Sequence, residues 1–343
     1  MTPAATRMFR EAAQAPGLAE RQLSLNEPLI RNLAGRLRAA PPRAVTTLGR
    51  GSSDNAATFA RYLIETRLGV MTASTAPSVS SIYESATAME DTLCLVISQS
   101  GKSPDLLAAA EASAAAGALV VALVNADNSP LASVAHVAIP LRAGPELSVA
   151  ATKSFIAALA AIVHLVAWWS EDACLLNAVE GLPATLQRAW ELDWSASLAP
   201  LAGAQHLYVV GRGLGYGVAQ EAALKFKETC GLHAEAFSAA EIRHGPMALV
   251  GPSFPVLAFL QDDETVAGVE AAVSAFARQG AQVLVAGRMH GRGIIGLPIV
   301  RGHPATEPIS QVQSFYKMVN ALALMRGHDP DRPPHLAKIT ETT

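Results

Sequence analysis

The sequence predicts an α/β protein made of two repeated, doubly wound domains, each a parallel sheet flanked by helices on both faces. Three observations favour this class. Short apolar runs alternate with helical patterns, the apolar runs are continuous, and one order of segments occurs twice. Continuous apolar strands are typical of parallel sheets that are buried on both faces. The 343 residues are enough for two such domains.

The internal repeat is the strongest sign of this organisation. Gly49 and Gly211, each followed by Arg-Gly after an apolar run, lie 162 positions apart. The apolar segments 93–99 and 255–261 have the same spacing, and residues 116–122 match 279–285. We therefore expect an N-terminal helical segment (1–35), a first repeat (36–190), a second repeat (191–325) and a C-terminal tail (326–343).

Composition and charge exclude several classes of protein. The chain has 26 basic and 29 acidic residues, a net charge of −3, and no basic cluster that would indicate a nucleic-acid partner. The apolar run Phe155–Trp169 is too short for a membrane span and predicts a buried helix. The first residues lack the apolar centre of a secretion signal. We expect a cytoplasmic protein without a membrane partner.

The three cysteines, Cys94, Cys174 and Cys230, form no CxxC pair and are odd in number. This pattern favours free thiols in a reducing compartment, and we expect all three to be small core residues.

The second repeat carries a group of charged residues just after its glycine-rich turn. A strand over 206–210, a turn over 211–217 and a helix through residue 228 are predicted. Glu221, Lys225 and Glu228 are spaced i, i+4 and i+7, which places them on one helix face. Acidic and basic residues with this spacing are common on solvent-exposed helix faces. Here the neighbours are Ala, Leu and Phe, which indicates a buried helix, and buried charges need a reason.

The first repeat carries an anion-binding pattern directly after one of its predicted strands. The strand 93–97 leads into Ser98-Gln-Ser-Gly-Lys-Ser103, called here the anion loop, and then into a helix over 106–116. Backbone N–H groups and the helix dipole favour an anion at a helix start. Alternatively, Ser103 is only the N-cap, followed by Pro104. Three serines, a glutamine and a lysine exceed what a cap requires.

The corresponding loop of the second repeat, 261–265, contains three acidic residues that would repel a phosphate. The repeats are therefore predicted to divide their work within one composite site. The first holds an anion, and the second supplies ionisable groups, including His244.

Nucleotide and metal chemistry are not supported. Tyr216 stands where the third glycine of a G-x-G-x-x-G fingerprint is required, and there is no Walker lysine or metal-ligand histidine spacing. We expect no cofactor and no metal, and a nicotinamide-dependent oxidoreductase is excluded by the missing fingerprint.

Nearly the whole chain resembles the tandem sugar-isomerase (SIS) family. It is similar to the isomerase half of glucosamine-6-phosphate synthase and to stand-alone SIS-type glucosamine-6-phosphate deaminases. The resemblance rests on Gly51-Ser-Ser53, the anion loop, Glu146-Leu-Ser-Val-Ala-Ala-Thr-Lys153, Gly211-Arg-Gly213, Glu221-Ala-Ala-Leu-Lys-Phe-Lys-Glu228, His233-Ala-Glu-Ala-Phe237, His244-Gly-Pro246 and His335-Leu-Ala-Lys338.

The resemblance implies a role for each matching residue. Glu228 would move a proton between sugar carbons 1 and 2, Lys225 would polarise nearby oxygens, and Glu221 would orient the site. His244 would open the sugar ring from the neighbouring subunit, which implies a homodimer with shared active sites. Lys338 on the tail would lie over the substrate and could form a Schiff base with a ketose. Phosphate binding would involve Ser53, Ser98, Gln99, Ser100 and Ser103, and further substrate contacts Ser52, Val149 and Ala150.

Two positions differ from the synthases. Lys102 stands where they commonly have Glu, and Ala151 where they have Ser. Residue 2 is Thr rather than the cysteine of a glutaminase, and the two repeats use the whole chain, so we expect a stand-alone enzyme. The implied activity is conversion of glucosamine 6-phosphate to fructose 6-phosphate and ammonia.

Other activities also fit the sequence. They are a galactosamine-6-phosphate deaminase/isomerase, a fructosamine-6-phosphate deglycase, a pure phosphosugar isomerase and a non-catalytic sugar-phosphate sensor. The presence of Glu228, His244 and Lys338 together favours catalysis over sensing, and neither charge nor the N-terminal helices indicate a DNA-binding segment.

Overall fold

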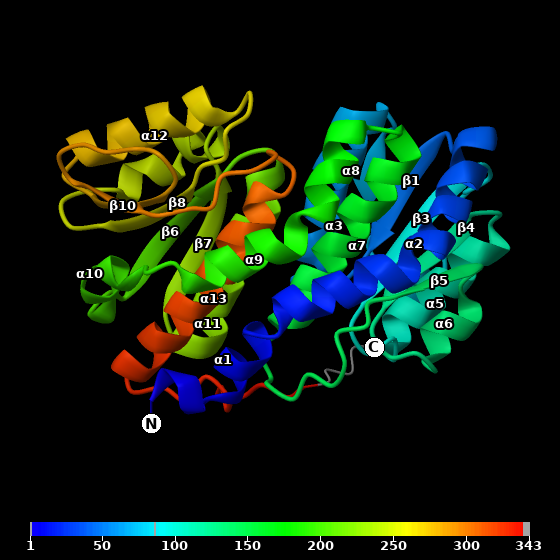
Figure 1. Cartoon of the computed structure of the whole chain (residues 1–343), viewed down its shortest axis with the longest axis horizontal. Coiled ribbons are helices and arrows are strands. Elements are labelled where there is room, and N and C mark those ends of the chain that lie inside the picture. Colours follow the sequence, from blue (N-terminus) through cyan, green and yellow to red (C-terminus); the bar gives the residue numbers. More distant parts are fainter. Residues whose placement is uncertain (1, 86, 339–343) are drawn as a thin grey trace. The chain divides into compact units, whose positions relative to one another are not determined.

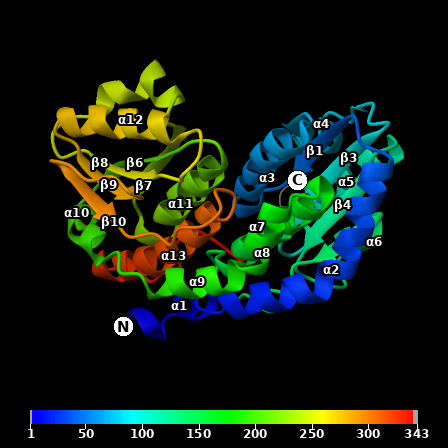
Figure 2. The ribbon, with the colours of Figure 1, turned by 45° about the horizontal axis from the view of Figure 1, so that its top comes forward.

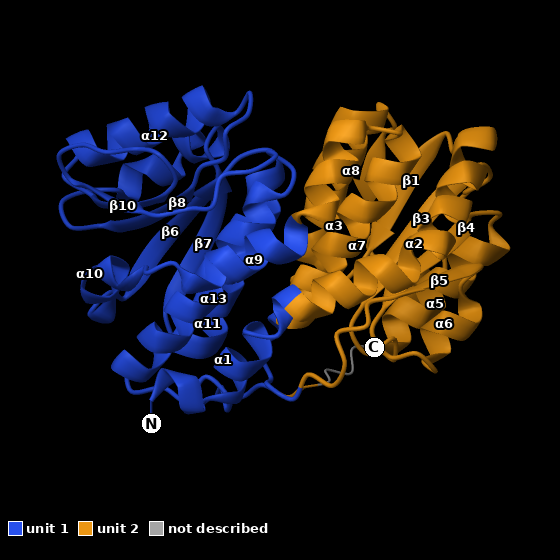
Figure 3. Ribbon diagram, viewed as in Figure 1, with its two compact units in different colours: residues 1–16, 147–152, 182–336 blue, residues 17–146, 153–181, 337–343 orange. Residues whose placement is uncertain are grey.

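A computed structural model describes residues 2–85 and 87–338, which form two compact units (Figure 3). Unit 1 contains residues 1–16, 147–152 and 182–336, and unit 2 contains 17–146, 153–181 and 337–343. The units are discontinuous in sequence, unlike the four consecutive segments expected from the sequence. Unit 1 contains all of the second repeat, and unit 2 contains most of the first, of which residues 147–152 and 182–190 belong to unit 1.

Unit 2 is a five-stranded parallel sheet in the order β2-β1-β3-β4-β5. Helices α3 and α7 pack together at one face, and α5 packs with α4 and α6 at the other (Figures 1 and 2). The strands are β1 (Ala44–Leu48), β2 (Thr72–Ser74), β3 (Thr92–Ser98), β4 (Leu119–Val124) and β5 (Val137–Pro140). The helices are α2 (Ala15–Ala39), α3 (Ser52–Leu68), α4 (Ser78–Ser81), α5 (Pro104–Ala115), α6 (Pro130–Val134), α7 (Lys153–Ser170) and α8 (Ala173–Glu180).

Unit 1 has a second parallel sheet, in the order β7-β6-β8-β9-β10. Helices α11 and α13 pack together at one face, and α12 covers the other (Figure 1). The strands are β6 (His206–Gly211), β7 (His233–Ser238), β8 (Pro255–Phe259), β9 (Gln282–Ala286) and β10 (Ile294–Leu297). The helices are α1 (Arg7–Ala12), α9 (Leu182–Glu191), α10 (Leu198–Ala202), α11 (Leu214–Cys230), α12 (Val266–Arg278) and α13 (Glu307–Met325), with 3-10 turns η1 (Pro3–Ala5), η2 (Ser195–Ser197), η3 (Glu241–His244) and η4 (Pro246–Leu249).

The backbone confirms the predicted repeat at two pairs of equivalent glycines. Gly51 precedes α3 with φ 54° and ψ −126°, and Gly213 precedes α11 with φ 58° and ψ −131°. Both helices are 17 residues long, and both end at a left-handed glycine, Gly69 or Gly231. Positive φ at these points is the conformation that favours glycine. The predicted fold class, two repeated doubly wound domains with parallel sheets, is confirmed.

One element begins earlier than expected. Helix α11 starts at Leu214, inside the glycine-rich stretch that predicts a turn over 211–217. A Cβ on Gly215 would lie 2.3 Å from Oε1 of Gln261, and a Cβ on Gly211 would lie 2.4 Å from the Gly215 carbonyl oxygen. These glycines therefore allow the close approach of the helix to its sheet rather than extending the turn.

The apolar run in the first repeat forms the buried helix α7, as predicted, but the expectation that it is too short for a span is wrong, because the helix extends to 18 residues. Of the helices in residues 2–85 and 87–338, α7 is the one long and apolar enough to cross a membrane, but 89% of it is buried within the protein. Buried core helices meet the same criteria, so this is weak evidence for a span. The expectation for the cysteines is wrong at one position. Cys94 and Cys230 are buried, whereas Cys174 is exposed in the first turn of α8.

Candidate functional site

Three charged side chains meet on one face of α11 in unit 1, called here the α11 cluster. The Lys225 ammonium lies 3.3 Å from Oε1 of Glu221 and also forms an ion pair with Oε2 of Glu228. The side chains of Glu221 and Lys225 are fully buried, and that of Glu228 is 19% exposed. The predicted shared face is confirmed, and a solvated surface ladder is excluded for the two buried members. Glu228 is the carboxylate that solvent reaches.

The charge on Lys225 is maintained by its neighbours. Burial would by itself lower the pKa of Lys225, because the ammonium loses its hydration. The carboxylates of Glu221 and Glu228, and the hydrogen bonds they accept, outweigh burial, so the pKa of Lys225 is raised above its ordinary value. Lys225 therefore acts as a fixed positive charge at neutral pH, and it can donate hydrogen bonds but cannot accept a proton.

His244 lies at the end of η3 and is exposed on unit 1. Within residues 2–85 and 87–338, its side chain makes no hydrogen bond or ion pair with another residue. The structure therefore leaves its predicted part in ring opening untested.

The segment of unit 1 that contains Val149 and Ala150 is held by a buried carboxylate. Glu11 of α1 accepts hydrogen bonds from the backbone N–H of Leu147 at 2.6 Å and of Ser148 at 3.0 Å. Sequence reasoning did not identify Glu11, because its partners are more than a hundred positions away. The two predicted substrate contacts follow these bonded residues in the chain. Val149 is half-buried and Ala150 is buried.

The anion loop of unit 2 follows β3 and leads directly into α5. Gly101 has φ 62°, and a Cβ there would lie 2.4 Å from Oγ of Ser129, so both conformation and space require glycine. Oγ of Ser98 accepts the Gly101 N–H at 3.0 Å, and Oγ of Ser100 accepts the Lys102 N–H at 3.4 Å. These bonds shape the loop from within.

Ser103 lies at the N-cap position of α5 but accepts no capping hydrogen bond. Pro104 occupies the first turn, where the missing N–H costs nothing. The capping explanation of this loop is therefore wrong for the Ser103 side chain. A half-buried hydroxyl at a helix start is suited to an anionic ligand.

The two turns of unit 2 that carry the predicted phosphate contacts are tied together by an ion pair. Nε and Nη2 of Arg50 donate to Oδ2 of buried Asp105 at 2.9 and 2.6 Å. Arg50 follows β1 and precedes Ser52 and Ser53, and Asp105 is in the first turn of α5 after β3. Because β1 and β3 are neighbouring parallel strands, both turns lie at one edge of the sheet. Sequence reasoning missed this pair, although an Arg between glycines in both repeats was a usable signal.

The tail lysine has a partner within unit 2. Nζ of Lys338 lies 3.2 Å from Oε2 of Glu146, a carboxylate that also accepts the Ser154 hydroxyl at 2.6 Å and, through Oε1, the Ser154 N–H at 3.2 Å. The tail from Gly327 to Lys338 has no regular helix, as predicted. Glu146 belonged to a matching segment, but the sequence did not indicate its ion pair with Lys338.

The structure thus groups the predicted residues within each unit. Unit 1 brings together the α11 cluster, and unit 2 brings the first turn of α3, with Ser52 and Ser53, and the anion loop, with Gln99, to one sheet edge. That both groups act on one substrate stays a prediction.

In the loop of the second repeat that corresponds to the anion loop, the polar side chains bond to neighbouring protein groups. Nε2 of Gln261 donates to the Arg212 carbonyl at 3.0 Å and to Asp263 at 2.8 Å, and Asp262 forms an ion pair with Arg301. Beside it is a cavity of about 130 Å³ with both acidic and basic groups in its wall. It is lined by Leu260, Gln261, Asp262, Val266, Glu270, Arg288, Ile299, Arg301 and Glu307. This loop is unlike a phosphate cradle, in agreement with its acidic sequence.

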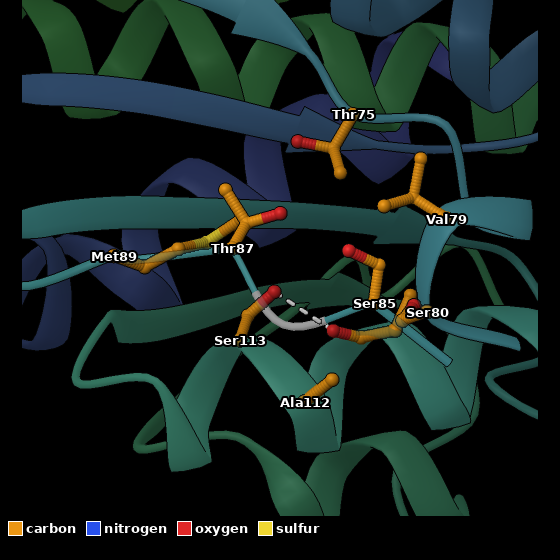
Figure 4. Close-up of a pocket in the computed structure, with 9 residues that line it drawn as sticks. Thr75, Val79, Ser80, Ser85, Thr87, Met89, Ala112 and Ser113 are labelled. Atoms are coloured by element: carbon orange, nitrogen blue, oxygen red, sulfur yellow. Dashed lines mark hydrogen bonds between the residues drawn. The ribbon is translucent and has the colours of Figure 1, made fainter. Parts of the chain in front are cut away.

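A smaller cavity in unit 2 lies between the segment after β2 and helix α5 (Figure 4). Its volume is about 20 Å³, enough for roughly one water molecule. Five of its nine lining residues carry hydroxyl groups, and that of Ser113 donates to the Ala109 carbonyl at 2.7 Å. It is lined by Thr75, Val79, Ser80, Ser85, Thr87, Met89, Ala109, Ala112 and Ser113, none of which belongs to the predicted site.

No group of three or more His, Cys, Asp or Glu side chains that could hold a metal ion occurs among residues 2–85 and 87–338. The polar groups are carboxylates and one buried ammonium in unit 1, and hydroxyls and backbone N–H groups in unit 2. The first set suits proton transfer, and the second suits an anion.

Comparison with known proteins agrees with this picture. The chain is 32% identical over 334 residues to the glutamine–fructose-6-phosphate aminotransferase (isomerizing) of Aeropyrum pernix, covering 92% of this chain and 53% of that protein. It therefore spans about half the length of the curated relatives that it matches. The solved structure of a Silicibacter pomeroyi DSS-3 protein provisionally named a phosphosugar isomerase has 43% identity and a TM-score of 0.91. It covers 95% of this chain and 100% of that chain.

A more distant structure shares the fold. The glucosamine-6-phosphate deaminase of Thermotoga maritima is 22% identical, with a TM-score of 0.79, and the match covers 98% of this chain and 100% of that chain. The sequence also matches the SIS domain over residues 40–167 and 200–291, one segment in each repeat. With two SIS segments on two matching parallel sheets, the chain belongs to the SIS domain family.

Proposed function

We propose that this protein is a phosphosugar isomerase that converts glucosamine 6-phosphate and water to fructose 6-phosphate and ammonia. The α11 cluster is the observation that carries the proposal. A partly exposed carboxylate, Glu228, is paired with an ammonium, Lys225, that is fully buried and remains charged. A base next to a fixed positive charge is the arrangement that aldose–ketose proton transfer needs, because negative charge develops on the substrate oxygens.

In this proposal, the substrate phosphate is held by unit 2. The Ser103 hydroxyl at the start of α5, with the neighbouring serines and backbone N–H groups, supplies donors that suit a phosphate oxygen. The Arg50–Asp105 ion pair holds together the turn after β1 and the turn after β3, which carry these groups. A grip on the remote phosphate supplies binding energy and orientation that the reacting carbons cannot.

Proton transfer would then follow ring opening, for which we assign His244. Glu228 removes the proton from carbon 2 of the open-chain amino aldose, and the electron pair moves toward the carbon 1 oxygen near Lys225. Return of the proton to carbon 1, with transfer of one N–H proton to the carbon 1 oxygen, gives a 2-imino sugar. Water adds to this imine, the C–N bond breaks, and ketose and ammonia leave. Atoms balance with water as the second reactant, so neither a redox step nor a cofactor is required.

The test is ammonia release by the purified protein, measured with glucosamine 6-phosphate and galactosamine 6-phosphate in parallel. Ketose 6-phosphate formation is measured at the same time. Ammonia and fructose 6-phosphate from the first sugar in equal amounts would support the proposal. Ammonia release only from galactosamine 6-phosphate would make that sugar the substrate. Isomerisation of sugar phosphates that lack an amino group, without ammonia release, would indicate a pure isomerase.

Binding without turnover would point to a different function. If both sugars bind but neither reacts, fructosamine 6-phosphates are the next substrates to assay, because their cleavage would use the same base and phosphate grip. Tight binding of sugar phosphates with no turnover of any of them would reject catalysis in favour of a sensor. A Glu228→Gln protein serves as the inactive control for every assay.

A further inference from the structure

A tyrosine of α13 contacts the α11 cluster from the neighbouring helix. The Tyr316 hydroxyl donates a hydrogen bond to Oε1 of Glu221 at 3.0 Å, across 95 positions of sequence. Both residues are fully buried in unit 1, where α11 and α13 pack together at one face of the sheet. The ring of Tyr316 lies 6.1 Å from that of Phe315. A phenylalanine would supply the same apolar packing, so the hydroxyl requires a separate explanation.

The charge of the cluster supplies that explanation. Two carboxylates, Glu221 and Glu228, share the single ammonium of Lys225. Glu221 carries its charge with no exposure to solvent, and a buried carboxylate is stabilised by donors that bond its ionised form. The Tyr316 hydroxyl is such a donor. It favours the ionised form of Glu221 and fixes its position.

The state of Glu221 matters to Glu228 because both bond to Lys225. An ionised Glu221 competes for the ammonium and so limits how strongly Lys225 holds the ionised form of Glu228. If Glu221 were protonated, Lys225 would act on Glu228 alone, and Glu228 would become a weaker base. The two carboxylates are therefore linked through one ammonium, as in other coupled titrating groups.

We propose that Tyr316 is a positioning residue for proton transfer: through Glu221 it fixes the charge and position of Lys225, and thereby sets the basicity of Glu228. The expected effect of Tyr316 on the reaction rate rests on the proposed function. The hydrogen bond by which Tyr316 stabilises ionised Glu221 does not depend on which sugar reacts.

The direct test is Tyr316→Phe, which removes only the hydroxyl. A hydrogen bond to a charged group contributes roughly 1.5–3 kcal/mol, so we expect kcat to fall about 10-fold or more. KM for the sugar phosphate should change less than about 2-fold, because the anion loop is untouched. The acid limb of the kcat profile should move to lower pH, because Glu221 then takes up a proton more easily and Glu228 becomes the weaker base.

The matched control is Tyr208→Phe. Tyr208 is also a buried tyrosine of unit 1, but it lies in the core cluster beneath α12 and packs against Phe237 and Phe254. This variant should leave kcat and the pH profile as in the wild type. A Tyr316→Phe protein with the kcat and pH profile of the control would overturn the inference, even if its melting temperature were lower.

A second measurement needs no turnover. The urea midpoint of Tyr316→Phe is compared with that of the wild type at pH 8 and at about pH 3, below the ordinary Glu pKa of about 4.3. Because the lost bond stabilised a charged carboxylate, the midpoint should fall more at the higher pH than at the lower one. An equal fall at both pH values would mean a merely structural role and would refute the inference. An inactive wild type with the expected pH dependence would instead reject the proposed function alone.

Discussion

Lys338 and Glu146 form an ion pair of 3.2 Å within unit 2, although 192 positions separate them. The Glu146 carboxylate is fully buried, and the lysine side chain is 25% exposed. The ion pair holds the Lys338 side chain against Glu146. A Schiff base with a ketose would require the Lys338 amine to leave this partner.

We expect fructose 6-phosphate and borohydride to modify Lys338. The amine and the ketone would form an iminium ion with loss of water, and hydride would reduce it to a stable secondary amine. Mass spectrometry of the tail peptide would detect the adduct. Replacing Glu146 with Gln should increase trapping, because Lys338 is then no longer held by the ion pair. Equal modification of a Lys338→Arg protein would contradict this assignment.

Glu228→Gln is expected to lower kcat by at least 10²-fold, since general base catalysis typically contributes 10²–10⁴-fold. The dissociation constant of the sugar phosphate, measured by calorimetry, should change little, because other residues are proposed to bind the phosphate. Glu264→Gln makes the same change of charge at an exposed position of unit 1 and should leave both quantities as they are. Equal loss of binding and turnover would count against Glu228 as the base.

Ser103→Ala should raise KM for sugar phosphates about 10-fold or more without lowering the melting temperature, because the Ser103 side chain does not cap α5. Asp172→Ala is the opposite case in the same unit. Asp172 caps α8 by accepting the N–H groups of Cys174 and Leu175. Its loss should cost roughly 0.5–2 kcal/mol of stability and leave KM unchanged. Steady-state kinetics and thermal melts of both variants would check this contrast.

His164 makes stability depend on pH. Burial lowers the pKa of His164 from 6.5 to about 4, because the charged imidazole loses hydration within α7. The unfolded chain therefore binds one more proton between these values, so stability falls as pH drops from 6.5 to 4 and is then constant. The total loss is about 3 kcal/mol.

The measurement is urea unfolding of wild type and His164→Gln between pH 7.5 and 4. The glutamine side chain retains an acceptor for Nε1–H of Trp168, which bonds His164 at 3.2 Å. The difference in unfolding free energy between the two proteins should shrink as pH falls. A constant difference would contradict the assigned titration.

Subunit mixing would test whether His244 serves a partner's site. Chains with His244→Ala and with Glu228→Ala are each expected to be nearly inactive. If sites are shared, a heterodimer of the two has one intact site and about half the wild-type rate. A purified heterodimer as inactive as its parents would reject shared sites.

The sequence by itself determined the features that depend on local pattern. The strand–glycine–helix order, the repeat through Gly49 and Gly211 and the shared face of Glu221, Lys225 and Glu228 follow from turn chemistry and helical spacing. These are properties of neighbouring residues, so one chain without relatives was enough to predict them.

Only the tertiary structure decided which charges are buried and what they contact. The bonds from Tyr316 to Glu221 and from Lys338 to Glu146 join residues 95 and 192 positions apart. No periodicity encodes such contacts, because they arise when helices and strands pack. The same reason explains why Cys174 is exposed while Cys94 and Cys230 are buried. It also explains the chain's division into two discontinuous units, because packing rather than sequence order defines them.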